Sequence, residues 1–222
     1  MTNNNKIVII GGGLAGCEAA YQISKFDINI DLYEMRPKVK TEAHQTKYLA
    51  ELVCSNSFRS DDKEYNAVGV LHEELRIADS LIMKCADHNK VPAGSALAVD
   101  RDNFSKEVNK TIKSIPNINI INQEVRSLDE FKNQLVIVST GPLTSKTLTE
   151  SIKIKTSENS LAFYDAIAPI VYEETINMSV AWKQSRYDKG NGDDYINCPL
   201  SKEEYYQFIE KIKKTVPVKS IL

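Results

Sequence analysis

The chain has 222 residues, of which 42% are hydrophobic and 26% are charged, and its formal net charge is −2. This length suits one large domain, or one domain and part of another, and the balanced charge excludes a global attraction to nucleic acid or acidic membranes. No apolar run approaches the ~20 residues of a membrane span, and the N-terminus has no signal-peptide core. The four cysteines form no CxxC pair and no metal-ligand cluster, which favours a reducing cytoplasm.

The first element is a short apolar run over residues 7–10, followed at once by a cluster of glycines: Gly11, Gly12, Gly13 and Gly16. A strand that turns sharply into a helix leaves backbone N–H groups that attract a pyrophosphate. In this Gly-x-Gly-x-x-Gly pattern we expect Gly11 to make the turn, Gly13 to admit a phosphate and Gly16 to pack the helix on the strand. The alternative is a glycine-rich turn in an ordinary βαβ unit.

A helix is predicted over residues 14–25, and Leu14 and Ala15 belong to its phosphate-binding first turn. A second strand is predicted where apolar residues alternate over residues 28–32. Glu34 follows it, close to the ~20-residue offset at which an acid binds ribose hydroxyls. An acid here favours an unphosphorylated ribose, as in FAD or NAD, over NADP.

Two more helices are predicted further along. Apolar residues at three- and four-residue steps predict one long helix over residues 66–89, with Leu71 and Leu75 on its apolar face. After a loop at residues 92–94, Asp102 is predicted to cap another helix. The apolar stripe of that helix consists of Phe104, Val108 and Ile112.

The ligand-binding edge of the sheet is predicted from the next strands. A third strand is expected at residues 118–120 and a fourth, very apolar strand at residues 135–138. The fourth leads into Thr140 and Gly141, a small-residue loop at the carboxyl edge, where such folds bind their ligands. Arg36 follows the second strand, near the expected ribose, and we expect it to help hold a phosphate.

These elements predict an α/β fold with a Rossmann-like dinucleotide-binding domain over residues 1–145. After about residue 145 tyrosines become frequent and the alternation of strand and helix fades, so residues 146–222 are expected to begin a second domain. Ser201 with Glu204 predicts the capping box of a late helix.

Several strings are more specific than the glycine pattern, above all Ala50–Ser57, with the sequence Ala-Glu-Leu-Val-Cys-Ser-Asn-Ser. Others are Gly11–Ala20, Leu32–Pro37, Val91–Gly94, Ala98–Asp102, Thr140–Thr144, Tyr164–Ala166, Ala168–Ile170, Ser185–Gly190 and Asn197–Pro199. Together they resemble the flavoprotein tRNA uracil-5-methyltransferases that use methylenetetrahydrofolate. The chain is similar, more loosely, to the GidA tRNA-modification flavoproteins, which share the first motif.

The resemblance implies a reaction and its cofactors. Methylenetetrahydrofolate carries the carbon, reduced FAD supplies a hydride, and the acceptor is carbon 5 of a uridine in the tRNA T loop, or of a ribosomal RNA uridine in a paralogous group. NADH or NADPH re-reduces the flavin. The glycine turn over residues 11–16 and Glu34 would then hold FAD, which performs the redox step while the protein orients the folate and excludes water.

Cys54 is the catalytic candidate. Carbon 5 of uracil is a poor nucleophile until a thiolate adds at carbon 6, so the family needs a reactive cysteine. Cys54 matches one of the family's two functional cysteines, and its neighbours Ser55, Asn56 and Ser57 are small and polar. The alternative is a buried, inert cysteine.

Members of the family are much longer than this chain. By resemblance, residues 1–145 are the first part of an FAD-binding domain, and residues 146–222 begin an α+β domain that is inserted into it on the substrate side. The family's second functional cysteine, which attacks uracil, and the return segment of the FAD-binding domain follow the position of Leu222. We therefore expect an incomplete FAD domain in a truncated form with little or no activity alone. The alternatives are an inactive remnant, one half of a split enzyme that needs a separate partner chain, and a generic FAD-dependent oxidoreductase.

Overall fold

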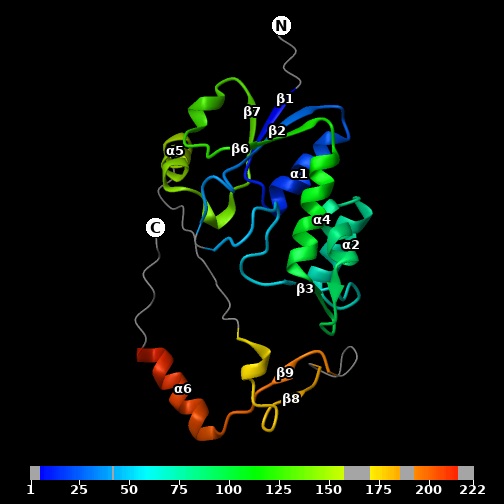
Figure 1. The fold of residues 1–222 in the computed structure, drawn as a ribbon, viewed down its shortest axis with the longest axis vertical. Helices are drawn as coiled ribbons and strands as arrows, with labels where there is room; N and C mark the ends of the chain where they lie inside the picture. The colour runs from blue at the N-terminus through cyan, green and yellow to red at the C-terminus, as the bar shows by residue number, and fades with distance from the viewer. Residues whose placement is uncertain (1–5, 42, 158–170, 186–192, 215–222) are drawn as a thin grey trace.

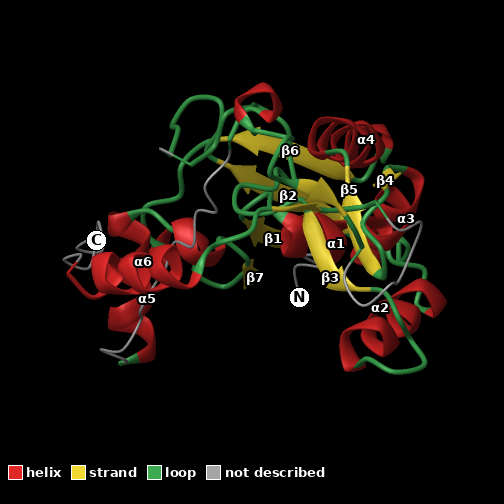
Figure 2. Ribbon diagram, turned by 90° about the horizontal axis from the view of Figure 1, so that it is seen from below, coloured by secondary structure: helices red, strands yellow, loops and turns green. Residues whose placement is uncertain are grey.

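The computed structural model describes residues 6–41, 43–157, 171–185 and 193–214. At its centre is a parallel sheet with the strand order β6-β2-β1-β7 (Figures 1 and 2). The strands are β1 (Lys6–Ile10), β2 (Asn29–Glu34), β6 (Ile118–Asn122) and β7 (Leu135–Val138). The predicted α/β, Rossmann-like fold class is therefore confirmed.

Helices cover both faces of this sheet, as Figure 2 shows. One face carries α1 (Leu14–Ser24), α3 (Leu81–His88) and α4 (Arg101–Ser114), and the other carries η1 (Leu128–Phe131) and α5 (Lys146–Thr156). Successive residues of β1 point to opposite faces, so Ile9 joins the first core while Val8 and Ile10 join the second. Burial on both faces explains the continuous apolar run of this strand.

The single long helix predicted over residues 66–89 is wrong. The chain forms α2 (Ala67–Ile77) and α3, separated by Asp79 at a φ of +61° and by Ser80, which caps α3. The apolar spacing continues across this break, which is why periodicity alone did not show it. Leu71 and Leu75 are consequently exposed instead of buried.

A second, antiparallel sheet with the order β3-β5-β4 was not predicted. Its strands are β3 (Ser57–Ser60), β4 (Lys90–Val91) and β5 (Ala96–Val99). Helix α4 follows β5 directly, and its cap is Asp100, which accepts a hydrogen bond from the backbone N–H of Asn103. The predicted cap Asp102 lies in the first turn instead. The predicted apolar stripe is confirmed: Phe104, Val108 and Ile112 are fully buried.

The remaining described elements are short, except for α6. They are η2 (Gly141–Leu143), η3 (Glu173–Thr175), β8 (Trp182–Lys183), β9 (Ile196–Asn197) and α6 (Lys202–Lys214). The capping box is confirmed, because the N–H of Ser201 donates to Glu204 and the N–H of Glu204 donates to Ser201. The division at residue 145 stays a prediction; Leu148 of α5 packs beside Val8 and Ile10 of the sheet.

Candidate dinucleotide-binding site

The glycine turn joins β1 to α1, and at two of its positions a side chain would collide with backbone atoms. Gly11 has a φ of +105°, and a Cβ there would lie 2.7 Å from the carbonyl oxygen of Ser139. A Cβ on Gly16 would lie 1.8 Å from the carbonyl oxygen of Gly11. Because such contacts are far too short for real atoms, the turn and the packing of α1 on β1 both require glycine.

Gly13 differs from these two because it faces open space. It is the N-cap of α1, and no atom lies within 4 Å of the position that a Cβ would take. The N–H groups of the first helical turn, which contains Leu14 and Ala15, have no acceptor inside the helix. With the helix dipole, they make this space favourable for an anion such as a pyrophosphate.

A pocket with about 560 Å³ of empty space, part of it open to solvent, borders the turn. Gly11–Gly13 form one wall, and the end of β2 with Glu34 and Arg36 forms another. The loop after β7, residues 123–125 after β6, His44 and Leu148 of α5 also line it. The pocket therefore lies at the carboxyl ends of parallel strands, where folds of this class bind their ligands.

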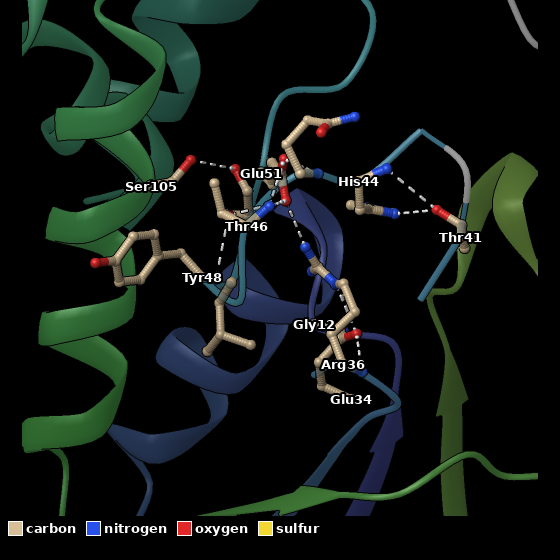
Figure 3. Close-up of polar contacts among 12 residues, drawn as sticks. Gly12, Glu34, Arg36, Thr41, His44, Thr46, Tyr48, Glu51 and Ser105 are labelled. Atoms are coloured by element: carbon tan, nitrogen blue, oxygen red, sulfur yellow. Dashed lines mark hydrogen bonds and ion pairs between the residues drawn. The ribbon is translucent and has the colours of Figure 1, made fainter. Parts of the chain in front are cut away.

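The carboxylate of Glu34 lies against the glycine turn (Figure 3). Its Oε2 accepts a hydrogen bond from the N–H of Gly12 at 3.0 Å, and its Oε1 accepts from the N–H and Nε of Arg36, both at 2.9 Å. Burial raises the pKa of Glu34, but the hydrogen bonds and charge of Arg36 and the N–H of Gly12 outweigh it and hold this pKa below its ordinary value. An ionised acceptor therefore forms part of the pocket wall.

The guanidinium of Arg36 lies between two carboxylates, and the side chain is 2% exposed (Figure 3). Its Nε donates to Glu34, and its Nη1 donates to Oε2 of Glu51 at 2.9 Å. The carbonyl oxygen of Arg36 accepts from Nδ2 of Asn122 at 2.5 Å, at the end of β6. Phosphate binding by Arg36 stays a prediction. Sequence reasoning missed Glu51, although it stands in the specific string Ala50–Ser57.

Hydrogen bonds join the loop after β7 to the glycine turn. Oγ of Ser139 donates to the carbonyl oxygen of Gly11 at 2.9 Å. Thr140 lines the pocket, whereas Gly141 begins η2 beside it and is not among the described residues of the lining. The structure thus brings Thr140 together with the turn and with Glu34 around one space.

Cys54 is half-buried in the segment before β3 and does not line this pocket as far as the chain is described. Its carbonyl oxygen accepts a hydrogen bond from Nη2 of Arg101, in the first turn of α4, at 3.3 Å. Burial raises the pKa of Cys17 and Cys85, that of Cys85 to about 12, so both are thiols of the core. Cys198 is exposed.

Each histidine contacts a neighbouring side chain. The pairs are His44 with Thr41, His72 with Asp61, and His88 with Glu107. Across the described parts of the chain, no group of three or more His, Cys, Asp or Glu is arranged to hold a metal ion. None of the described helices has the length and apolar character needed to cross a bilayer.

Comparisons with known proteins agree with the expected resemblance. The model of a family described as "Glucose inhibited division protein A" matches residues 6–219. A protein of Bartonella henselae named methylenetetrahydrofolate–tRNA-(uracil-5-)-methyltransferase TrmFO is 57% identical over 211 residues, which are 93% of this chain and 45% of that protein.

Proteins of the same name come from two further bacteria. The one from Paramagnetospirillum magneticum is 57% identical over 204 residues, which are 92% of this chain and 46% of that protein. The one from Rhizobium meliloti is 53% identical over 215 residues, which are 95% of this chain and 46% of that protein. The chain therefore spans about half the length of the curated relatives it matches.

Proposed function

Because this chain belongs to the family described as glucose inhibited division protein A, we propose that it is the FAD-binding half of a folate-dependent RNA uridine methyltransferase. The proposed reaction delivers a carbon from methylenetetrahydrofolate to carbon 5 of a uridine in the tRNA T loop. The relatives' name supports the carbon donor, the tRNA and the uracil position. The observation that carries the proposal is the glycine turn with the ionised Glu34 beside an open pocket.

The residues of the pocket fit an adenine dinucleotide. The open space at Gly13 and the N–H groups of the first turn of α1 would hold the pyrophosphate. The carboxylate of Glu34 would accept hydrogen bonds from ribose hydroxyls, and Thr140 offers a hydroxyl on the facing loop. When bound, FAD supplies the hydride that turns the folate-carried methylene into a methyl group.

Within this half, we propose Cys54 as the functional cysteine. A thiolate that adds to carbon 6 of uracil makes carbon 5 nucleophilic. By resemblance, the cysteine that makes this addition lies in the segment that follows the matched half, and Cys54 is the first of the family's two functional cysteines. Cys54 is half-buried in a polar segment, whereas Cys17 and Cys85 lie in the core with raised pKa values. The other residues of the reaction centre would come from the polypeptide that follows the matched half in the relatives.

The proposal includes further reactants and the remaining part of the enzyme. NADH or NADPH re-reduces the flavin, and a ribosomal RNA uridine is the alternative acceptor. The chain spans 45% and 46% of the length of two relatives, and the rest of the enzyme would lie in the polypeptide that corresponds to their other half. A cytoplasmic location is supported by the wide spacing of the cysteines.

Flavin binding tests the cofactor part. The purified 222-residue protein, mixed with FAD and separated from free flavin, should retain visible flavin absorbance. Gly13→Val should stay folded and lose the flavin, because its Cβ has no protein atom within 4 Å and its side chain occupies the space at the start of α1. A folded wild-type protein that retains no flavin contradicts the proposal.

RNA methylation tests the enzyme part. The chain is joined to the remaining half of the Bartonella henselae relative, and transfer of labelled carbon from methylenetetrahydrofolate to T-loop RNA is measured. We expect transfer by this chimera, none by the chain alone, and none by a chimera with Cys54→Ser. Flavin reduction without folate binding would instead support a generic FAD-dependent oxidoreductase, and neither flavin nor folate binding would indicate an inactive remnant.

A further inference from the structure

The carboxylate of Glu51 folds the preceding residues back on themselves. Oε1 accepts hydrogen bonds from the N–H groups of Gln45 and Thr46 at 2.7 and 3.2 Å, and Oε2 accepts from Oγ1 of Thr46 at 2.9 Å (Figure 3). The Glu51 side chain is 10% exposed. A carboxylate with several charge-assisted bonds in so little solvent holds a defined position. Segment 44–51 is therefore shaped by one side chain.

Segment 44–51 also contacts the glycine turn directly. The N–H of Ala50 donates to the carbonyl oxygen of Gly12 at 2.8 Å. Leu49 is 2% exposed, and a carbon of its side chain lies 2.6 Å from where a Cβ on Gly12 would be. Ser105 of α4 donates to the carbonyl oxygen of Ala50 at 3.4 Å, so the segment is clamped between the turn and α4. At its other end, His44 lines the pocket.

Arg36 connects Glu51 with Glu34. Its guanidinium uses Nη1 for Glu51 and Nε for Glu34, so the position of one carboxylate depends on the other through a single rigid fork. Without Glu51, the Nη1 group loses a charged acceptor in a site that is 2% exposed. The guanidinium then has to find another acceptor, and the nearest charged one is Glu34, which would rotate away from the N–H of Gly12.

We infer that Glu51 is a positioning residue for an adenine dinucleotide: through Arg36 it orients the ribose acceptor Glu34, and through Gln45 and Thr46 it orients the pocket wall at His44. The inference rests on the proposed FAD site and assigns it a residue that does not itself line the pocket. Glu51 stands three residues before Cys54. Its contacts therefore also fix the position of the chain that leads from the glycine turn to Cys54.

Titration of the full chain with FAD tests the inference, using Glu51→Ala and Glu51→Gln. We expect Glu51→Ala to weaken FAD binding about tenfold or more, the effect of one lost charge-assisted hydrogen bond. Glu51→Gln keeps the volume and one oxygen acceptor, so it should recover part of that loss. Thermal unfolding of each variant is measured in parallel.

Asp61→Ala is the matched control. Asp61 is 14% exposed and accepts hydrogen bonds from Arg76 and His72, but it lies outside the pocket lining. This variant should lower the unfolding temperature as Glu51→Ala does and leave FAD affinity unchanged. A variant that loses stability but keeps its FAD affinity shows that the loss of affinity in Glu51→Ala does not come from lower stability.

Three outcomes overturn the inference. If Glu51→Gln and Glu51→Ala both bind FAD as tightly as the wild type does, the positioning role of Glu51 is contradicted and the proposed FAD site is not. Equal losses of affinity in Asp61→Ala and Glu51→Ala show that only stability matters. A folded wild-type chain without any FAD binding overturns the proposed function, and with it this inference. If Glu51→Ala does not fold, the affinity of Glu51→Gln decides.

Discussion

Two arginines in this molecule each pair with several carboxylates, in very different surroundings. Arg36 pairs with Glu34 and Glu51, and Arg76 pairs with Asp61, Asp87 and, at 3.7 Å, Glu73. The side chain of Arg36 is 2% exposed and that of Arg76 is 25% exposed. Water can replace a lost partner at Arg76 but not at Arg36. A buried group of ion pairs beside a pocket therefore fixes the positions of the pocket's side chains. The similar group at the surface only holds helix α2 in place.

Helix α2 shows what the outer arrangement does. Arg76 and the buried His72 face inward and meet Asp61, and Gly69 lies against the backbone of Asp62. The apolar residues of α2 point outward instead, and those exposed are Val70, Leu71, Leu75 and Ile77. Figure 1 shows α2 at the outer side of the helical layer. Ion pairs, and not apolar burial, therefore orient this helix.

Removal of each arginine gives the largest expected contrast. Arg36→Met leaves Glu34 and Glu51 buried without their cation, which should cost about 3–5 kcal/mol of the free energy of unfolding. Arg76→Met should cost about 1 kcal/mol, because Asp87 is 39% exposed and Asp61 keeps its contacts with His72 and Lys90. Urea unfolding of both variants measures the difference. Equal losses of unfolding free energy would show that the burial of Arg36 does not matter.

Each region also contains a glycine in close contact with backbone. Gly16→Ala places a Cβ 1.8 Å from the carbonyl oxygen of Gly11, inside the core, and should cost about 3 kcal/mol. Gly69→Ala places one 2.3 Å from the backbone of Asp62, in the half-buried turn before α2. Alanine favours the helix over glycine by about 1 kcal/mol, so we expect a net cost of about 2 kcal/mol. Thermal unfolding gives both values, and a larger loss in Gly69→Ala would reverse the ranking.

Acid should weaken both arrangements. The pKa values of Glu34 and Asp61 lie below their ordinary values, because burial raises them less than the hydrogen bonds from Arg36, or from Arg76 and His72, lower them. A carboxyl group with a lowered folded-state pKa stabilises the fold at pH above its unfolded-state pKa. That contribution is lost as the pH falls through the folded-state pKa.

For Glu34, the loss of unfolding free energy should begin as the pH falls below 4.5, the ordinary pKa of a glutamate side chain. Urea unfolding across this pH range should show that the free energy of unfolding falls less with acid in Glu34→Gln and in Asp61→Asn than in the wild type. Added salt should reduce the effect of Asp61→Asn more than that of Glu34→Gln, because the partner Arg76 is 25% exposed whereas Arg36 is 2% exposed, and salt screens exposed charges. If both variants lose as much unfolding free energy in acid as the wild type does, these two carboxylates do not cause the loss.

The smallest effect is expected on the outer face of α2. Leu71→Ala should change the free energy of unfolding by less than about 0.5 kcal/mol, because 51% of Leu71 is already exposed. Leu81→Ala is the matched control: this leucine is 3% exposed in the core, and its loss should cost about 2–5 kcal/mol. Chemical unfolding compares the two. A large loss in Leu71→Ala would show that this face is buried in solution.

Local patterns predicted the part of the fold that surrounds the glycine turn. Strand β1, helix α1 and the position of Glu34 follow from spacing over a few residues, and β7 was predicted with its observed bounds, Leu135–Val138. The long helix failed because a single residue with positive φ, Asp79, interrupts an unbroken apolar period. The cap of α4 is Asp100 and not Asp102, because β5 ends one residue before it.

The sequence by itself determined that a strand, a glycine turn and a helix stand before an acid, because turn geometry and periodicity act between near neighbours. Only the tertiary structure decided how that acid is held. Arg36 meets Glu51 across 15 positions, and Ser105 reaches Ala50 across 55. Buried charges must find partners wherever the fold brings them, so their pairing depends on packing that no local pattern contains.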